Sequence, residues 1–158
     1  CISGQDAYEE VTINFLKEAA KKDKNIVYLF VPRRRKATEF QSVDYPDNLL
    51  IVDDLNVYET MKISDFHSTV NSTCALEAPS LGKKNLMINI EGLAKKYYAH
   101  ILDNKEITEY YNSAHDFTEG IKNQMKIPEE QIRILNKSII LPHYTENLKS
   151  AFDTIFEE

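Results

Sequence analysis

The chain has 158 residues, which is enough for one domain with its own buried core. Its hydrophobic content of 42% and charged content of 28% are ordinary for a globular protein, and its net charge of −6 argues against a nucleic-acid partner. No apolar run reaches the roughly 20 residues that a membrane-spanning helix needs. The two cysteines, Cys1 and Cys74, give neither a disulfide framework nor metal-ligand spacing, which favours a cytoplasmic protein.

The first half of the chain alternates between extended and helical segments. The opening residues read as the end of a strand that begins before Cys1, so we expect the chain to be part of a longer protein. A capping signature at Asp6 to Glu9 predicts a helix that ends near Lys22. Short apolar runs predict buried strands at 26–31 and 49–52. Asn56 and Glu59 form a second capping signature, which predicts a helix through residue 62.

The second half continues the alternation. Strands are predicted at 65–69, 85–90 and 106–111, and helices at 72–81, where Gly82 is the stop, and at 94–102. Asp116 is expected to cap a further helix with Met125 on its apolar face, Pro128 to open a short helix, and Glu146 to begin a final amphipathic one. Strands separated by helices predict an α/β fold, a Rossmann-like three-layer α/β/α domain with a mostly parallel sheet over residues 1–158.

Polar residues follow the predicted strands, where ligands bind in open α/β sheets. They are residues 3–6, 32–36, 53–56 and 71–73. Asn71, Ser72 and Thr73 stand at a predicted helix start, where backbone N–H groups and small hydroxyl side chains can bind an anion. Glu77 lies about one turn further on and could accept hydrogen bonds from ribose hydroxyls. The alternative is that Ser72 only caps the helix and Glu77 is a solvated helical side chain.

Other candidate groups are less distinctive. Residues 33–36 form a basic run, Arg33-Arg34-Arg35-Lys36, which suits phosphate oxygens but is also typical of a solvated loop. His67 is the one histidine expected near the cleft, and we interpret it as a packed or capping side chain. No metal-ligand pattern, glycine-rich dinucleotide motif or P-loop is present, which argues against metal, NAD and P-loop ATP sites.

A family resemblance appears at residues 64–84, which read SDFHSTVNSTCALEAPSLGKK. This segment resembles the donor-binding domain of GT-B glycosyltransferases. It is similar in particular to bacterial capsule and polysaccharide-biosynthesis proteins of the polysialyltransferase-like and CDP-glycerol glycerophosphotransferase-like kinds, which carry a small-Ser-Thr, Glu-Ala, Gly-Lys pattern here. Residues 51–58 and 85–90 look like the loop beneath the nucleotide base and the following strand of those proteins.

The resemblance implies roles for individual residues. Ser72 and Thr73 would bind the donor phosphate, and Glu77 the ribose. Asp54, Leu55 and Asn56 would line the base, mainly through their backbone. Many relatives carry a His-Pro pair after the second strand, where this chain reads Val31-Pro32-Arg33, so Arg33 would supply the positive charge instead.

The function implied is transfer of a sugar or polyol phosphate from a CMP-, CDP- or UDP-linked donor during surface polysaccharide synthesis, without a cofactor or required metal. The acceptor site and general base would lie in a preceding domain, so this chain alone would bind nucleotide without turnover, and the whole enzyme could sit at the inner face of the membrane. Two alternatives remain at this point: a UDP-N-acetylglucosamine 2-epimerase-like domain, which would want more histidine and acidic residues in the cleft, and a non-catalytic partner-binding module.

Overall fold

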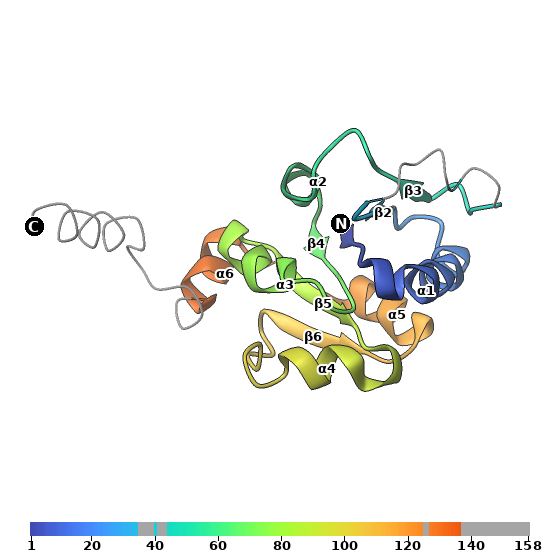
Figure 1. Ribbon diagram of the computed structural model, residues 1–158. Coiled ribbons are helices and arrows are strands. Elements are labelled where there is room, and N and C mark those ends of the chain that lie inside the picture. Colours follow the sequence, from blue (N-terminus) through green and yellow to red (C-terminus); the bar gives the residue numbers. More distant parts are fainter. Residues whose placement is uncertain (35–39, 41–43, 125–126, 137–158) are drawn as a thin grey trace, which may run out of the picture.

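The strands lie in two parallel three-stranded sheets (Figure 1). The computed structural model describes residues 1–34, 40, 44–124 and 127–136. One sheet contains β1 (Ile2–Ser3), β2 (Tyr28–Val31) and β3 (Leu49–Ile51), in the order β1-β2-β3. The other contains β4 (Phe66–His67), β5 (Lys84–Ile88) and β6 (Thr108–Tyr111), in the order β4-β5-β6. Every pairing is parallel, as the alternation of strands and helices predicted.

A backbone ladder joins the two sheets through β1 and β4. Ile2 pairs in parallel with Ser68, the Ser3 N–H donates to the Ser68 carbonyl at 3.0 Å, and the Ser68 N–H donates to the Cys1 carbonyl at 2.8 Å. The strand order across both sheets is therefore β3-β2-β1-β4-β5-β6, the order of the doubly wound Rossmann fold. The direction of winding reverses between β1 and β4, and the predicted fold class is confirmed.

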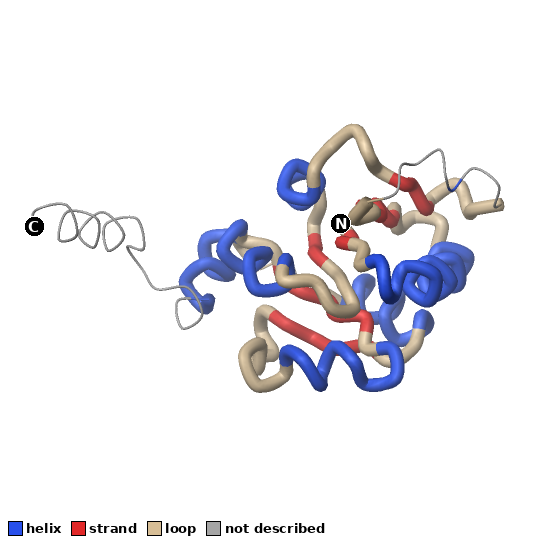
Figure 2. Tube along the Cα trace, viewed as in Figure 1, coloured by secondary structure: helices blue, strands red, loops and turns tan. Residues whose placement is uncertain are grey.

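Helices cover both faces of the sheet (Figure 2). On one face, α1 (Glu9–Lys22) packs beside α5 (Ala114–Asn123), and both contribute to a core that includes Leu86 and Ile88 of β5. On the other face lie α3 (Cys74–Glu77) and α4 (Leu93–Tyr98), which pack with Met87 of β5. Because successive strand side chains point to opposite faces, β5 is buried from both sides along its whole length.

The part of the sheet formed by β2 and β3 is less covered than the sequence predicted. Tyr28 and Phe30 of β2 are buried, but Leu50 of β3 is 46% exposed and Val27 is 58% exposed. The prediction of a buried strand at 49–52 is correct for Leu49, which is buried, but wrong for Leu50, since β3 is the edge strand of the sheet.

The helix boundaries differ from the predictions at two starts. A 3₁₀ turn, η1 (Asp6–Tyr8), precedes α1, and neither Gln5 nor Tyr8 makes a side-chain capping bond. The predicted cap at Asp116 is also displaced, because the Ser113 hydroxyl accepts from the Asp116 N–H and α5 starts at Ala114.

The capping box of Asn56 with Glu59 is confirmed at α2 (Val57–Ile63). Two further 3₁₀ turns are η3 (Ala78–Leu81), which ends at Gly82 as predicted, and η4 (Ile90–Gly92).

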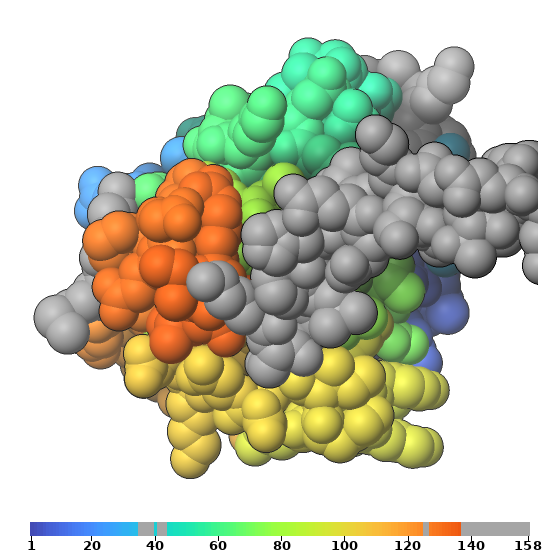
Figure 3. Space-filling view, turned by 90° about the vertical axis from the view of Figure 1, so that its left-hand side faces the viewer, coloured from blue at the N-terminus to red at the C-terminus, as the bar shows by residue number. Residues whose placement is uncertain are grey.

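A last short helix, α6 (Glu129–Leu135), packs on η3. Pro128 stands at its N-cap rather than in its first turn. Figure 3 shows α6 in orange, between α2 above and α4 with its following turn below. The expected helix from Glu146 and the position of Met125 lie outside the described residues. Among those that are described, no helix combines the length and apolar character needed to cross a bilayer.

Candidate functional site

A cavity of about 560 Å³, here called the rim pocket, lies beyond the carboxyl ends of the strands. Its walls come from the segments that follow β1, β2, β3 and β4, so it lies where the winding of the sheet reverses. Ligands of open α/β folds bind at this position, and the volume is within the range of small-molecule sites. The lining residues are Ser3, Gly4, Gln5, Val31, Pro32, Arg33, Arg34, Val52, Asp53, Leu55, Asn56, Val57, Ser72, Thr73 and Cys74.

Gly4 brings the turn after β1 close to the end of β2. Its N–H donates to the Val31 carbonyl at 2.8 Å. A Cβ atom at this position would stand 2.9 Å from the Phe30 ring, closer than real Cβ atoms approach, and 3.0 Å from the Val31 carbonyl oxygen, which is also a tight contact. A glycine is therefore needed to form this wall of the pocket.

Ser72 and Thr73 line the pocket at the start of α3, as predicted. Ser72 is buried and its hydroxyl oxygen lies 3.4 Å from the Cys74 N–H, while Thr73 is exposed and makes no capping bond. The predicted helix over 72–81 is split, because α3 has four residues and Pro79 then favours the 3₁₀ turn η3. So short a helix has a weak dipole, and an anion here would depend mainly on the two hydroxyl groups.

Glu77 belongs to α3, the helix that starts at the pocket, but its carboxylate is hydrogen-bonded to another side chain. It is half-buried, it does not line the rim pocket, and its carboxylate accepts a hydrogen bond of 2.5 Å from the Tyr58 hydroxyl of α2. This bond raises the pKa of Tyr58 to about 12. The predicted ribose ligand thus has a protein partner that a ribose hydroxyl would have to replace.

The basic residues after β2 divide into two kinds. Arg33 and Arg34 both line the pocket and both are exposed. Arg34 forms an ion pair of 3.2 Å with Asp6, whereas Arg33 is the residue that the family resemblance assigned to the phosphate. Arg35 and Lys36 lie outside the described residues.

Only part of the loop after β3 that was predicted to line a nucleotide base lies in the pocket wall. Leu55 and Asn56 line the pocket, but Asp54 does not. The Asn56 side-chain oxygen is used by the capping box, where it accepts from the N–H groups of Tyr58 and Glu59. Asn71, expected beside Ser72, also lies outside the pocket lining.

A buried polar network beneath the pocket was not predicted. The Ser3 hydroxyl lies 3.0 Å from His67 Nε2, and His67 Nδ1 lies 2.7 Å from Asn85 Oδ1. Burial lowers the pKa of His67 to about 4. The register of the sheet places His67 opposite Asn85, so the network could have been found only once the strand order was known.

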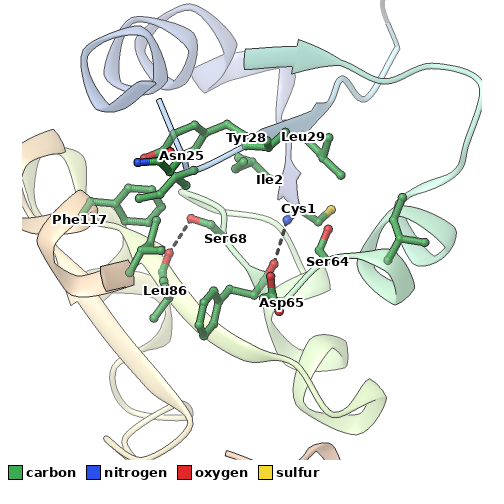
Figure 4. A pocket seen from close by; sticks show the side chains of 15 residues that line it. Cys1, Ile2, Asn25, Tyr28, Leu29, Ser64, Asp65, Ser68, Leu86 and Phe117 are labelled. Carbon is green, nitrogen blue, oxygen red and sulfur yellow. Dashed lines mark hydrogen bonds between the residues drawn. The ribbon is translucent and has the colours of Figure 1, made fainter. Parts of the chain in front are cut away.

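A second cavity, of about 450 Å³, lies at the opposite, amino-terminal edge of the sheet (Figure 4). Part of its lining belongs to the apolar core, including Tyr28, Leu86 and Phe117. The Ser68 hydroxyl in its wall donates to the Leu86 carbonyl at 2.5 Å. We favour the rim pocket as the candidate site because it combines hydroxyl and guanidinium groups at the edge where α/β ligands bind.

Comparisons with protein-family models, with curated proteins and with solved structures found no match to this chain. Among the described residues, no cluster of three or more histidine, cysteine, aspartate or glutamate side chains could hold a metal ion.

Proposed function

We propose that the chain is the nucleotide-donor-binding domain of a GT-B glycosyltransferase of surface polysaccharide synthesis. The observation that carries the proposal is the rim pocket, which lies at the reversal point of a doubly wound sheet and contains Ser72, Thr73 and Arg33 together. These side chains present two hydroxyl donors and a guanidinium, the groups that bind phosphate oxygens best.

The chemistry proposed is transfer of a sugar or polyol phosphate from a CMP-, CDP- or UDP-linked donor. The acceptor hydroxyl oxygen forms a bond to the transferred group and gives its proton to the general base, while the bond to the nucleotide phosphate breaks and negative charge develops on that leaving phosphate. Hydrogen bonds from Ser72 and Thr73 and the charge of Arg33 would stabilise it, and such stabilisation of developing charge is a major source of catalysis. The acceptor hydroxyl and its general base would belong to a preceding domain.

The nucleoside would extend from the phosphate site toward α2. Glu77 would accept hydrogen bonds from the ribose hydroxyls in place of Tyr58, and Leu55 and Asn56 would lie beside the base. The whole enzyme would work in the cytoplasm at the inner face of the membrane, where a polysaccharide acceptor is extended.

The test is calorimetric titration of the 158-residue chain with CDP, CMP and UDP. We expect saturable binding of at least one nucleotide, weakened at least about tenfold when Ser72 and Thr73 are both replaced by Ala, because each loses a hydrogen bond to a charged oxygen. Higher salt should weaken the binding as well, since the exposed Arg33 is screened.

Ser64→Ala is the matched control, because the Ser64 hydroxyl bonds to Thr60 of α2 and lines the cavities at the opposite edge. It should leave nucleotide affinity unchanged. Glu77→Ala should reduce affinity while the circular dichroism spectrum stays the same, whereas a partner-binding module would show no effect. A folded chain that gives no heat with any of the three nucleotides would remove the basis for the proposal.

A further inference from the structure

Three polar side chains connect the rim pocket to the interior of the sheet. Ser3 is 5% exposed and lines the pocket, whereas His67 and Asn85 are completely buried. The bonds run from the Ser3 hydroxyl to His67 Nε2 at 3.0 Å, from His67 Nδ1 to Asn85 Oδ1 at 2.7 Å, and from Asn85 Nδ2 to the Ala75 carbonyl at 2.7 Å. We call this chain of bonds the Ser3 relay.

The far end of the relay fixes its direction. The Ala75 carbonyl can only accept, so the Asn85 NH₂ group must face it and the Asn85 oxygen must face His67. The opposite amide orientation would place two acceptors 2.7 Å apart. Because Asn85 Oδ1 can only accept, His67 Nδ1 carries the hydrogen.

Neutral His67 then has a lone pair on Nε2. Complete burial disfavours the charged imidazolium and lowers the pKa of His67 to about 4, so the ring is neutral at pH 7. A neutral imidazole with hydrogen on Nδ1 can only accept at Nε2. The Ser3 hydroxyl must therefore donate its proton to His67, and its oxygen keeps only lone pairs for other partners.

We propose that Ser3 is a specificity-determining residue of the rim pocket, at which the relay presents a hydrogen-bond acceptor to an N–H or O–H group of the ligand. The ligand class, a nucleotide, comes from the proposed function, whereas the direction of the relay comes from side-chain geometry alone. A phosphate oxygen cannot use this position, because the Ser3 proton is committed to His67.

Ser72 has the opposite polarity within the same pocket. Its oxygen lies near the Cys74 N–H, so its own proton remains available to donate to a phosphate. The pocket thus has a donor end at Ser72 and Thr73 and an acceptor position at Ser3. A phosphate with a nucleoside or sugar attached matches both, whereas inorganic pyrophosphate matches only the donor end.

The first measurement is the tautomer of His67 in the ¹⁵N-labelled full chain, read from its imidazole nitrogen chemical shifts without ligand. We expect the neutral ring with hydrogen on Nδ1 at pH 7. Hydrogen on Nε2 would reverse the relay and overturn the proposal. This result does not depend on whether the proposed function is right.

The second measurement compares binding of CDP and of inorganic pyrophosphate by calorimetry. Ser3→Ala should weaken CDP binding roughly five- to tenfold, the effect of one hydrogen bond, and leave pyrophosphate binding unchanged. Ser72→Ala should weaken both ligands. Should Ser3→Ala fail to fold, Ser3→Cys keeps a side chain of similar size with a poor acceptor and is expected to give the same selective loss.

Ser68→Ala is the matched control, because the Ser68 carbonyl accepts from the Ser3 N–H but its hydroxyl bonds to the Leu86 carbonyl beside the other cavity (Figure 4). It should affect neither ligand. Equal losses of CDP and pyrophosphate in Ser3→Ala, or no loss at all, would overturn the proposal. If the wild-type chain binds neither probe, the ligand assignment falls together with the proposed function, and the tautomer alone decides the direction of the relay.

Discussion

At the scale of single residues, the hydrogen bond between Tyr58 and Glu77 links α2 to α3 beside the candidate site. Tyr58 is 48% exposed, so water competes with this bond and its net contribution to folding is small. Its main consequence concerns ligands. A ribose that used Glu77 would first have to displace the phenol hydroxyl.

Tyr58→Phe is expected to tighten nucleotide binding by about two- to threefold, because it removes the competing donor while keeping the aromatic ring. Calorimetric titration with the best-binding nucleotide measures the change. Tyr110→Phe is the control, since the Tyr110 hydroxyl donates to the Leu102 carbonyl and lines a different cavity. Weaker binding in Tyr58→Phe would show instead that the hydroxyl itself contacts the ligand.

The sequence identified some of these residues but not their partners. Ser72, Thr73 and Arg33 could be predicted because each follows a strand, and strand ends converge in a parallel sheet. The partner of Glu77 is 19 residues away and the partner of Ser3 is 64 residues away, and both pairings depend on how the elements pack. Local spacing holds no information about such contacts.

At the scale of elements, α6 packs against the turn at Gly82 and makes polar contacts with its neighbours. The buried Lys83 ammonium donates to Glu129 at 2.6 Å, Arg133 donates to the Leu81 carbonyl at 3.2 Å, and Ile132 is buried. Gly82 has a φ of +78° and lies directly under the start of α6, where an added Cβ would stand 2.5 Å from the Cβ of Glu129. Both the backbone and the packing therefore require glycine here.

A left-handed backbone costs a non-glycine residue about 1–3 kcal/mol. Gly82→Ala is expected to lower the free energy of unfolding by more than this amount, because the added Cβ also clashes with α6. Gly92→Ala is the matched control: its φ is +77°, but an added Cβ would meet nothing within 4 Å, so only the backbone cost applies. Urea denaturation of the two variants measures the difference. Equal stability losses would mean that α6 moves aside without cost.

Element boundaries were predictable where a cap acts locally. The capping box of Asn56 and Glu59 needs only four consecutive residues, and it was found as predicted. At α5 the signal was ambiguous because Ser113 and Asp116 are both good caps, and the structure uses Ser113. The exposure of Leu50 could not be predicted, since it depends on β3 being the edge of the sheet.

At the scale of the whole molecule, the junction of β1 and β4 unites two three-stranded sheets. His67 lies at this junction and bonds to Ser3 on one side and to Asn85 on the other. The same side chain thus supports the rim pocket and the continuity of the sheet. Its protonation would place an unpaired charge at the centre of the fold, which connects the stability of the molecule to pH.

The stability of the fold should therefore fall as the pH is lowered from about 6.5 to about 4. Burial lowers the pKa of His67 to about 4 from its ordinary value of 6.5. In this interval the unfolded chain binds a proton that the folded chain does not, so acid favours unfolding, and the lost stability amounts to about 3 kcal/mol by pH 4. Urea denaturation at a series of pH values measures this slope.

His67→Gln should be less stable at pH 7 yet lose much less stability over the same interval, because glutamine does not titrate. If the variant keeps the full acid dependence, groups other than His67 cause it. The unfolding measurements would then give no evidence that His67 is neutral in the folded chain, as the Ser3 relay requires.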